Sequence, residues 1–159
     1  MNIGFLGLGK LGLPVSLAVE DKGHKIYGYD ISKQTLEDIR NKKIRYREEW
    51  VDRYLPNTKL EINDIDQLVK NSEIIFVPIQ TPHDPQYEGV TRIPNKRIDF
   101  DYSYLKSGIK DLSEAIEKNG EDKVVIIIST VLPGTIRSQI KPLLGNHTKL
   151  CYNPFFIAM

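Results

Sequence analysis

A glycine-rich segment near the start of the chain has the spacing expected of a phosphate-binding loop. Gly7, Gly9 and Gly12 directly follow a short apolar run and open a stretch with helical spacing. Gly7 would permit a tight turn, Gly9 would let a pyrophosphate approach the backbone, and Gly12 would let helix and strand pack closely. The anion would lie on the unpaired N–H groups at the start of the helix. The pattern predicts a dinucleotide site, although a glycine-rich turn without a ligand fits the same positions.

An acidic residue stands where such a site needs one. Asp30 ends the second apolar run, and a carboxylate there accepts hydrogen bonds from the hydroxyls of the adenosine ribose. The same charge repels a 2′-phosphate, so the sequence favours NAD over NADP. Lys33, in the helix that follows, either contacts the cofactor or is a solvated surface lysine.

Hydroxyl and amide side chains recur at the ends of the later apolar runs. Thr81 and Pro82 follow one run, Ser129 and Thr130 the next, and Asn153 the last. Because ligands of an open parallel sheet bind beyond the carboxyl ends of its strands, we expect these residues to line the site. The structural alternative is helix capping, since Ser and Thr often precede a helix at such turns.

The elements that must position these residues alternate along the chain. Apolar runs predict strands, and amphipathic or capped segments predict helices. The expected strands are 2–6, 25–30, 73–79, 123–128 and 149–152, and the expected helices are 11–21, 33–41, 64–70, 105–116 and 135–144. Strands that are apolar along their whole length indicate a parallel sheet covered on both faces. We therefore predict an α/β fold with a doubly wound, Rossmann-like sheet.

Two helix caps and two irregular segments complete this scheme. Ser32 is expected to cap the second helix and Thr135 the last one. Segment 42–55 has no clear assignment, and segment 81–100 predicts a long loop that is functional or mobile. Five strands are recognisable where a complete dinucleotide fold has six, and the chain has an apolar ending. We expect a sheet truncated after the fifth or sixth strand, in one domain (1–159) of a longer protein.

The composition excludes several classes of protein. The length of 159 residues and the 40% hydrophobic content suit one globular domain. A net charge of +1 argues against a nucleic-acid partner, and no apolar run is long enough to cross a membrane. The single cysteine, Cys151, favours a reducing, cytoplasmic location and is expected to be a small buried hydrophobe. The histidines His24, His83 and His147 lack metal-ligand spacing, so we expect no metal site.

Five segments in a fixed order carry a resemblance to a known family. They are Gly7–Pro14, Thr81–Pro82, Asp101–Leu105, Ser129–Thr135 and Tyr152–Pro154. Together they resemble the N-terminal, NAD-binding domain of the UDP-glucose/GDP-mannose (nucleotide-sugar 6-) dehydrogenase family over the whole chain. The Ser-Thr-Val-x-Pro-Gly-Thr element is the most specific. The glycine loop alone would not separate this family from 3-hydroxyacid or 6-phosphogluconate dehydrogenases.

The resemblance implies a four-electron oxidation in polysaccharide biosynthesis. Enzymes of this family convert the C6 hydroxymethyl group of a UDP- or GDP-sugar to a carboxylate with two NAD⁺, through a thiohemiacetal and a thioester on a cysteine of a later domain. The sugar-binding and catalytic-cysteine domains would then lie outside this chain, which alone would be inactive, and dimers would form through those segments. Carried over by position, Lys10, Leu11, Asp30, Thr81 and Thr130 would line the NAD site. Thr130 would also be catalytic, by helping to place the hydrolytic water.

Two departures from the family pattern concern the substrate side, where Asn153, Phe155 and Phe156 are expected. Phe155 follows Asn-Pro where the family has a glutamate implicated in hydrolysis. Losing a general acid/base typically lowers a rate by about 10²–10⁴-fold. Cys151 lacks the glycine-rich surroundings of the family's nucleophile. Three readings stay open: part of a working dehydrogenase, a degenerate NAD-binding module without turnover, and a different NAD-dependent hydroxyacid dehydrogenase.

Overall fold

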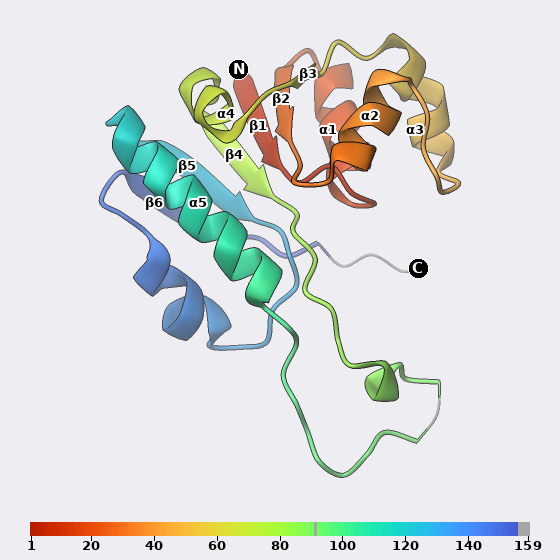
Figure 1. Cartoon of the computed structure of the whole chain (residues 1–159), viewed down its shortest axis with the longest axis vertical. Coiled ribbons are helices and arrows are strands. Elements are labelled where there is room, and N and C mark those ends of the chain that lie inside the picture. Colours follow the sequence, from red (N-terminus) through yellow and green to blue (C-terminus); the bar gives the residue numbers. More distant parts are fainter. Residues whose placement is uncertain (91, 156–159) are drawn as a thin grey trace.

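The structure is a computed structural model that describes residues 1–90 and 92–155. Its centre is a six-stranded sheet of order β3-β2-β1-β4-β5-β6 in which every neighbouring pair is parallel (Figure 1). The strands are β1 (Asn2–Leu6), β2 (Lys25–Tyr29), β3 (Glu61–Ile62), β4 (Ile74–Val77), β5 (Lys123–Ile127) and β6 (Thr148–Tyr152). The strand order reverses between β1 and β4, and ligands of such sheets bind at the carboxyl ends of the strands beside that reversal.

The helices connect successive strands. They are α1 (Gly12–Asp21), α2 (Lys33–Arg40), α3 (Glu49–Tyr54), α4 (Ile65–Asn71) and α5 (Ser103–Asn119). Short 3₁₀ turns span Leu55–Asn57, Pro85–Tyr87 and Lys141–Leu143, and a π-helical turn spans Ile136–Ile140. Among the described residues, no helix combines the length and apolar character that a membrane span requires.

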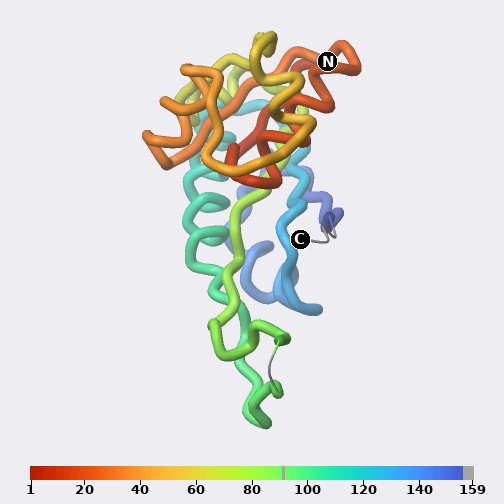
Figure 2. Tube along the Cα trace, turned by 90° about the vertical axis from the view of Figure 1, so that its right-hand side faces the viewer, coloured from red at the N-terminus to blue at the C-terminus, as the bar shows by residue number. Residues whose placement is uncertain are grey.

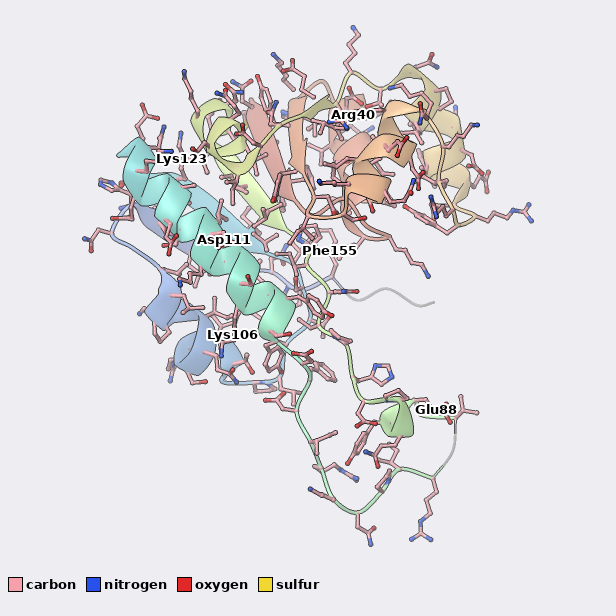
Figure 3. The ribbon with its side chains drawn as sticks, viewed as in Figure 1. Arg40, Glu88, Lys106, Asp111, Lys123 and Phe155 are labelled. Atoms are coloured by element: carbon pink, nitrogen blue, oxygen red, sulfur yellow. The ribbon has the colours of Figure 1, made fainter. Side chains whose placement is uncertain are left out.

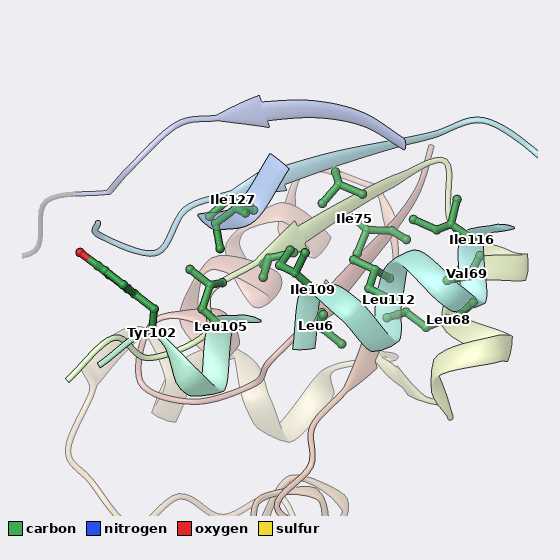
Figure 4. Close-up of a cluster of buried hydrophobic side chains, with 14 of the residues drawn as sticks. Leu6, Leu68, Val69, Ile75, Tyr102, Leu105, Ile109, Leu112, Ile116 and Ile127 are labelled. Atoms are coloured by element: carbon green, nitrogen blue, oxygen red, sulfur yellow. The ribbon is translucent and has the colours of Figure 1, made fainter. Parts of the chain in front are cut away.

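Each face of the sheet has its own hydrophobic core, as expected of a doubly wound fold. On one face, α1, α2 and α3 pack on the sheet, and Phe5 of β1 belongs to this core. On the other face, α4 and α5 pack on β4 and β5 in the cluster of Figure 4. Leu105, Ile109, Leu112 and Ile116 of α5 are at most 1% exposed, which confirms the amphipathic face that their spacing predicts.

Three sequence predictions about local structure were wrong. The sheet has a further strand, β3, which is too short to leave a pattern and forms by pairing with β2. Thr135 makes no capping hydrogen bond; its hydroxyl instead points to the Tyr102 phenol oxygen (3.4 Å). Cys151 is exposed, because β6 is an edge strand and the neighbouring Leu150 points to the core in its place. The Ser32 cap is confirmed, since its side chain accepts the Thr35 N–H.

A long loop between β4 and α5 extends away from the packed sheet and helices. We define its described residues, 82–90 and 92–101, as the arm; Figures 1 and 2 show the arm projecting away from the sheet at the carboxyl ends of the strands. Its base is closed by a hydrogen bond from the Asp101 N–H to the Pro82 carbonyl (2.8 Å). The arm confirms the long loop predicted for this part of the sequence.

Candidate functional site

The glycine loop between β1 and α1 gives its three glycines three different surroundings. Gly7 has a φ of +118°, in the region that favours glycine, and its N–H donates to the Tyr29 carbonyl (2.8 Å). Gly12 is buried, and a Cβ there would overlap the Gly7 carbonyl oxygen. Gly9 is exposed, and apart from its two chain neighbours no described residue has an atom within 4 Å of where its Cβ would be. The loop is therefore closely packed at Gly12, against the strand, and open to solvent at Gly9. A pyrophosphate would need such an open space beside the backbone.

The start of α1 is electrostatically suited to an anion. Among the described residues, no side chain caps this helix, and its first turn holds no acidic residue. The helix dipole makes this end positive. The Leu13 and Val15 N–H groups donate to carbonyls of the preceding turn (3.0 and 3.3 Å) and Pro14 has no N–H, so the dipole is the main attraction that this end offers an anion. Lys10, just before the helix, is exposed and adds a full positive charge. Leu11 occupies the N-cap position in a helical conformation.

Asp30 links the glycine loop to the start of α2. Its Oδ2 accepts the Leu8 N–H (2.7 Å), and its Oδ1 accepts the Ser32 N–H (2.8 Å). The residue is half-buried, and each carboxylate oxygen keeps a lone pair for a further donor such as a ribose hydroxyl. Lys33 is exposed on the first turn of α2. The sequence analysis predicted a ribose contact for Asp30. It did not predict that Asp30 also accepts a hydrogen bond from the backbone of the glycine loop.

The ends of β4 and β5 bring together residues that are far apart in the sequence. Thr81 donates its hydroxyl to the Thr130 carbonyl (2.6 Å). Ser129 is 4% exposed, and its hydroxyl lies 2.5 Å from the Ile79 carbonyl and 3.1 Å from the Val77 carbonyl. Ser129 thus joins the two strand ends, and its predicted cofactor contact stays a prediction. Thr130 is exposed.

Two tyrosines that the sequence analysis did not single out contact the same loop. Tyr152 accepts the Val131 N–H (3.2 Å), and Tyr102 accepts the Leu132 N–H (3.1 Å). Burial is the main cause that raises the pKa of the Tyr102 phenol, and Asp99 raises it further, so the phenol keeps its proton at neutral pH. Both tyrosines stand inside the segments that carry the family resemblance, and that position is the signal that could have found them.

The residues that the sequence predicts on the substrate side extend the pairing of β5 and β6 beyond the strands. The Asn153 N–H donates to the Ile127 carbonyl (3.0 Å), and the Phe155 N–H donates to the Ile128 carbonyl (3.2 Å). Asn153 is exposed and Phe155 half-buried, and Figure 3 shows Phe155 at the carboxyl edge of the sheet, beside the end of β4. The predicted substrate residue Phe156 lies outside the described residues. The described residues contain no cluster of three or more potential metal ligands.

Comparison with known sequences agrees with this geometry. The sequence model of the UDP-glucose/GDP-mannose dehydrogenase family, NAD binding domain, matches residues 1–158. UDP-N-acetyl-D-mannosamine dehydrogenase of Pyrococcus horikoshii is 30% identical over 154 residues, which are 94% of this chain and 33% of that protein. GDP-mannose 6-dehydrogenase of Pseudomonas aeruginosa is 26% identical over 149 residues, or 91% of this chain and 32% of that protein. The chain spans about a third of the length of these relatives.

Solved structures share the fold. GDP-mannose dehydrogenase from Pseudomonas aeruginosa, in a ternary complex, superposes with a TM-score of 0.82 at 24% identity, covering 99% of this chain and 37% of that one. UDP-glucose dehydrogenase from the hyperthermophilic archaeon Pyrobaculum islandicum gives a TM-score of 0.80 at 22% identity, covering 99% and 36%. These likenesses establish the doubly wound architecture.

Proposed function

The chain belongs to the UDP-glucose/GDP-mannose dehydrogenase family as its NAD-binding domain, and from this premise we propose that it is the cofactor-binding part of an NAD-dependent nucleotide-sugar 6-dehydrogenase. The proposed reaction is the oxidation of the C6 hydroxymethyl group of a UDP- or GDP-sugar to a carboxylate with two NAD⁺. The names of the two relatives above support this substrate class. We assign residues 1–159 to the NAD-binding domain, and the sugar site and nucleophilic cysteine to further domains.

The observation that carries the proposal is the convergence of complementary groups on one edge of the sheet, beside the strand reversal between β1 and β4. The open space at Gly9 and the uncapped start of α1 suit a pyrophosphate, with Lys10 and Leu11 beside it. Asp30 presents a carboxylate for the adenosine ribose and disfavours a 2′-phosphate. Lys33, exposed on α2, is close enough in sequence to be assigned to the same half of the cofactor.

The nicotinamide half of the cofactor would then lie over the ends of β4 and β5, on the other side of the reversal. We assign this part of the site to Thr81, Pro82, Ser129 and Thr130. Bound NAD⁺ would supply a hydride acceptor there. The hydroxyl of Thr130, exposed at this edge, can hold a water or a substrate hydroxyl by a hydrogen bond, which is the catalytic role we propose for it.

A second candidate function is an NAD-binding module without turnover. Phe155 favours it, because an apolar ring stands where the family resemblance places a glutamate for hydrolysis. We nevertheless assign Asn153, Phe155 and Phe156 to the substrate side, since they follow β6 at the same edge. Restoring glutamate at position 155 in a protein that also holds the remaining domains separates the two: faster thioester hydrolysis supports the dehydrogenase with an altered step.

The proposal extends to the protein's setting. A cytoplasmic location in polysaccharide biosynthesis is supported by the free thiol of Cys151 and by the sugar-acid product of the proposed reaction. The nearly balanced charge supports a small-molecule substrate over a nucleic acid. A homodimer through the further domains completes the proposed assembly.

Calorimetric titration of the chain with NAD⁺ and NADP⁺ tests the cofactor assignment. The chain should bind NAD⁺ more tightly than NADP⁺. Asp30→Asn should weaken NAD⁺ binding by about tenfold or more, the size of hydrogen bonds to a charged group, and weaken NADP⁺ binding less. Asp21→Asn, which removes the same charge at the far end of α1, serves as the control. Equal losses for both cofactors would remove Asp30 from the ribose contact.

A further inference from the structure

The loop that carries Thr130 has no regular secondary structure, and its backbone N–H groups need partners from elsewhere. Two consecutive ones, those of Val131 and Leu132, donate to phenol oxygens. The phenols belong to Tyr152 at the end of β6 and Tyr102 at the start of α5. Two elements distant in the sequence therefore hold neighbouring peptide groups of this loop.

The proton of each phenol has its own acceptor, which fixes the direction of these bonds. Tyr102 donates to Asp99 Oδ1 (2.5 Å), so its oxygen is free to accept the Leu132 N–H (3.1 Å). Tyr102 is 5% exposed, and Figure 4 shows its ring at the end of the core with the hydroxyl at the outer tip. The Tyr152 hydroxyl lies 3.4 Å from the Val131 carbonyl, so it contacts both polar groups of that residue.

The peptide group between Thr130 and Val131 is held at its carbonyl as well as at its N–H, and the residue before Thr130 is held through its side chain. Ser129 joins its hydroxyl to the end of β4, and Thr81 donates to the Thr130 carbonyl. The backbone is thus restrained before and after Thr130, while the Thr130 side chain stays exposed. Restraint of this kind presents one side chain in one orientation.

We propose that Tyr102 and Tyr152 are positioning residues that hold the Thr130 loop in the conformation required for the nicotinamide half of NAD⁺. The inference rests on the proposed function, which assigns the pyrophosphate and adenosine to α1 and Asp30 and the nicotinamide to the loop. Loss of either phenol oxygen leaves one loop N–H without its partner, and the loop then spends less time in the binding conformation. A ligand that lacks nicotinamide does not use the loop and keeps its affinity.

The test compares Tyr102→Phe and Tyr152→Phe with Tyr104→Phe, a matched control whose ring is 52% exposed. Calorimetry with NAD⁺ measures binding to the whole proposed site. Calorimetry with ADP-ribose, which lacks nicotinamide, measures binding to the pyrophosphate and adenosine half alone. We expect the NAD⁺ dissociation constant to rise about threefold to tenfold in the first two variants, the effect of one hydrogen bond, with ADP-ribose unchanged. Amide exchange by NMR should be about tenfold faster at Leu132 in Tyr102→Phe and at Val131 in Tyr152→Phe.

Each other outcome overturns the inference in a recognisable way. Parallel losses for NAD⁺ and ADP-ribose would show that the tyrosines support the fold as a whole. Faster amide exchange with unchanged NAD⁺ affinity would show that the loop conformation is irrelevant to the cofactor. Absence of NAD⁺ binding in the unchanged chain would refute the proposed function itself. Tyr152 is 37% exposed, so its variant keeps the test decisive if Tyr102→Phe does not fold.

Discussion

Gly9 and Gly12 belong to one motif but depend on the absence of a side chain for different reasons. At Gly12 a Cβ would overlap the backbone of Gly7 and crowd Pro78, so the requirement comes from the fold itself. At Gly9 no described residue other than the two chain neighbours has an atom within 4 Å of such a Cβ, so the fold accepts a methyl group there. The room at Gly9 is what the proposed pyrophosphate would fill.

Alanine substitutions should separate these two roles. Gly12→Ala should lower the free energy of unfolding by about 1–3 kcal/mol or more, because the core cannot move aside for backbone overlap. Gly9→Ala should leave the unfolding transition nearly unchanged and weaken NAD⁺ binding at least about tenfold, since the methyl group occupies the space of a phosphate oxygen. Thermal unfolding and calorimetry measure both. A Gly9→Ala variant that binds NAD⁺ normally would contradict the placement of the pyrophosphate.

At the scale of elements, β6 shows how an edge strand determines the environment of a side chain. Successive residues of a strand point to opposite faces. Leu150 packs against the core that α5 covers, whereas Cys151, opposite Ile126 of β5, is exposed on the other face. Val124, on the same face as Cys151, is 36% exposed.

Cys151 should therefore react with thiol reagents in the native protein. We expect labelling by Ellman's reagent without denaturant at a rate within about tenfold of the unfolded chain, because thiol reactivity depends on access. The reaction has one target, since the chain has a single cysteine, and Cys151→Ser provides the blank. Labelling that requires denaturant would show that this face of β6 is covered.

The start of β6 is also tied to the turn before β5 by an ion-pair cluster. Asp122 contacts Lys149 of β6 (3.0 Å) and His147 (3.0 Å). Lys149, followed by His147, holds the pKa of Asp122 below its ordinary value of 3.8. A carboxyl group with a lowered folded-state pKa stabilises the protein above its unfolded-state pKa, and this contribution disappears as the pH falls through the folded-state value.

Acid unfolding should reveal this contribution. Asp122→Asn should lower the melting temperature slightly near neutral pH, and the difference from the unchanged chain should disappear as the pH falls through the lowered pKa of Asp122. The effect is small because the cluster is solvent-exposed, and added salt should reduce it further. Melting curves between pH 2 and 7 measure it, with Asp21→Asn as a charge-matched control. A difference that persists at low pH would assign the loss to packing instead.

At the scale of the whole molecule, both halves of the sheet contribute to the proposed cofactor site. The site lies at the carboxyl ends of the strands, on either side of the reversal between β1 and β4. The β1–β2 half contributes the glycine loop and Asp30, and the β4–β5 half contributes Thr81 and Thr130. The arm leaves from these same strand ends. Cys151 is the penultimate residue of the edge strand β6, whereas the proposed nicotinamide position lies over the ends of β4 and β5.

The chain should consequently bind NAD⁺ without oxidising a nucleotide sugar. We expect no NADH absorbance when the chain is mixed with NAD⁺ and UDP-glucose, UDP-N-acetylmannosamine or GDP-mannose. The reason is that the chain's single cysteine, Cys151, lies on the edge strand β6, and the proposed function assigns the nucleophile to a further domain. Turnover that disappears in Cys151→Ser would overturn the assignment of the nucleophile to another domain.

The sequence by itself determined the features whose signals lie within a few neighbouring residues. Apolar periodicity predicted five strands and the buried face of α5, Ser32 marked a helix start, and the glycine spacing marked the loop. Such signals are local because backbone conformation and the direction of side chains repeat over short distances. The family motifs extended this reading to NAD, since they also lie within short segments.

Only the tertiary structure decided which distant residues meet. The Asp30–Leu8, Thr81–Thr130 and Tyr102–Leu132 hydrogen bonds join residues far apart in the chain. Strand β3 likewise forms because the path of the chain brings it beside β2. These contacts follow from sheet order and strand ends, which no short stretch of sequence encodes. These contacts could therefore be identified only from the folded structure.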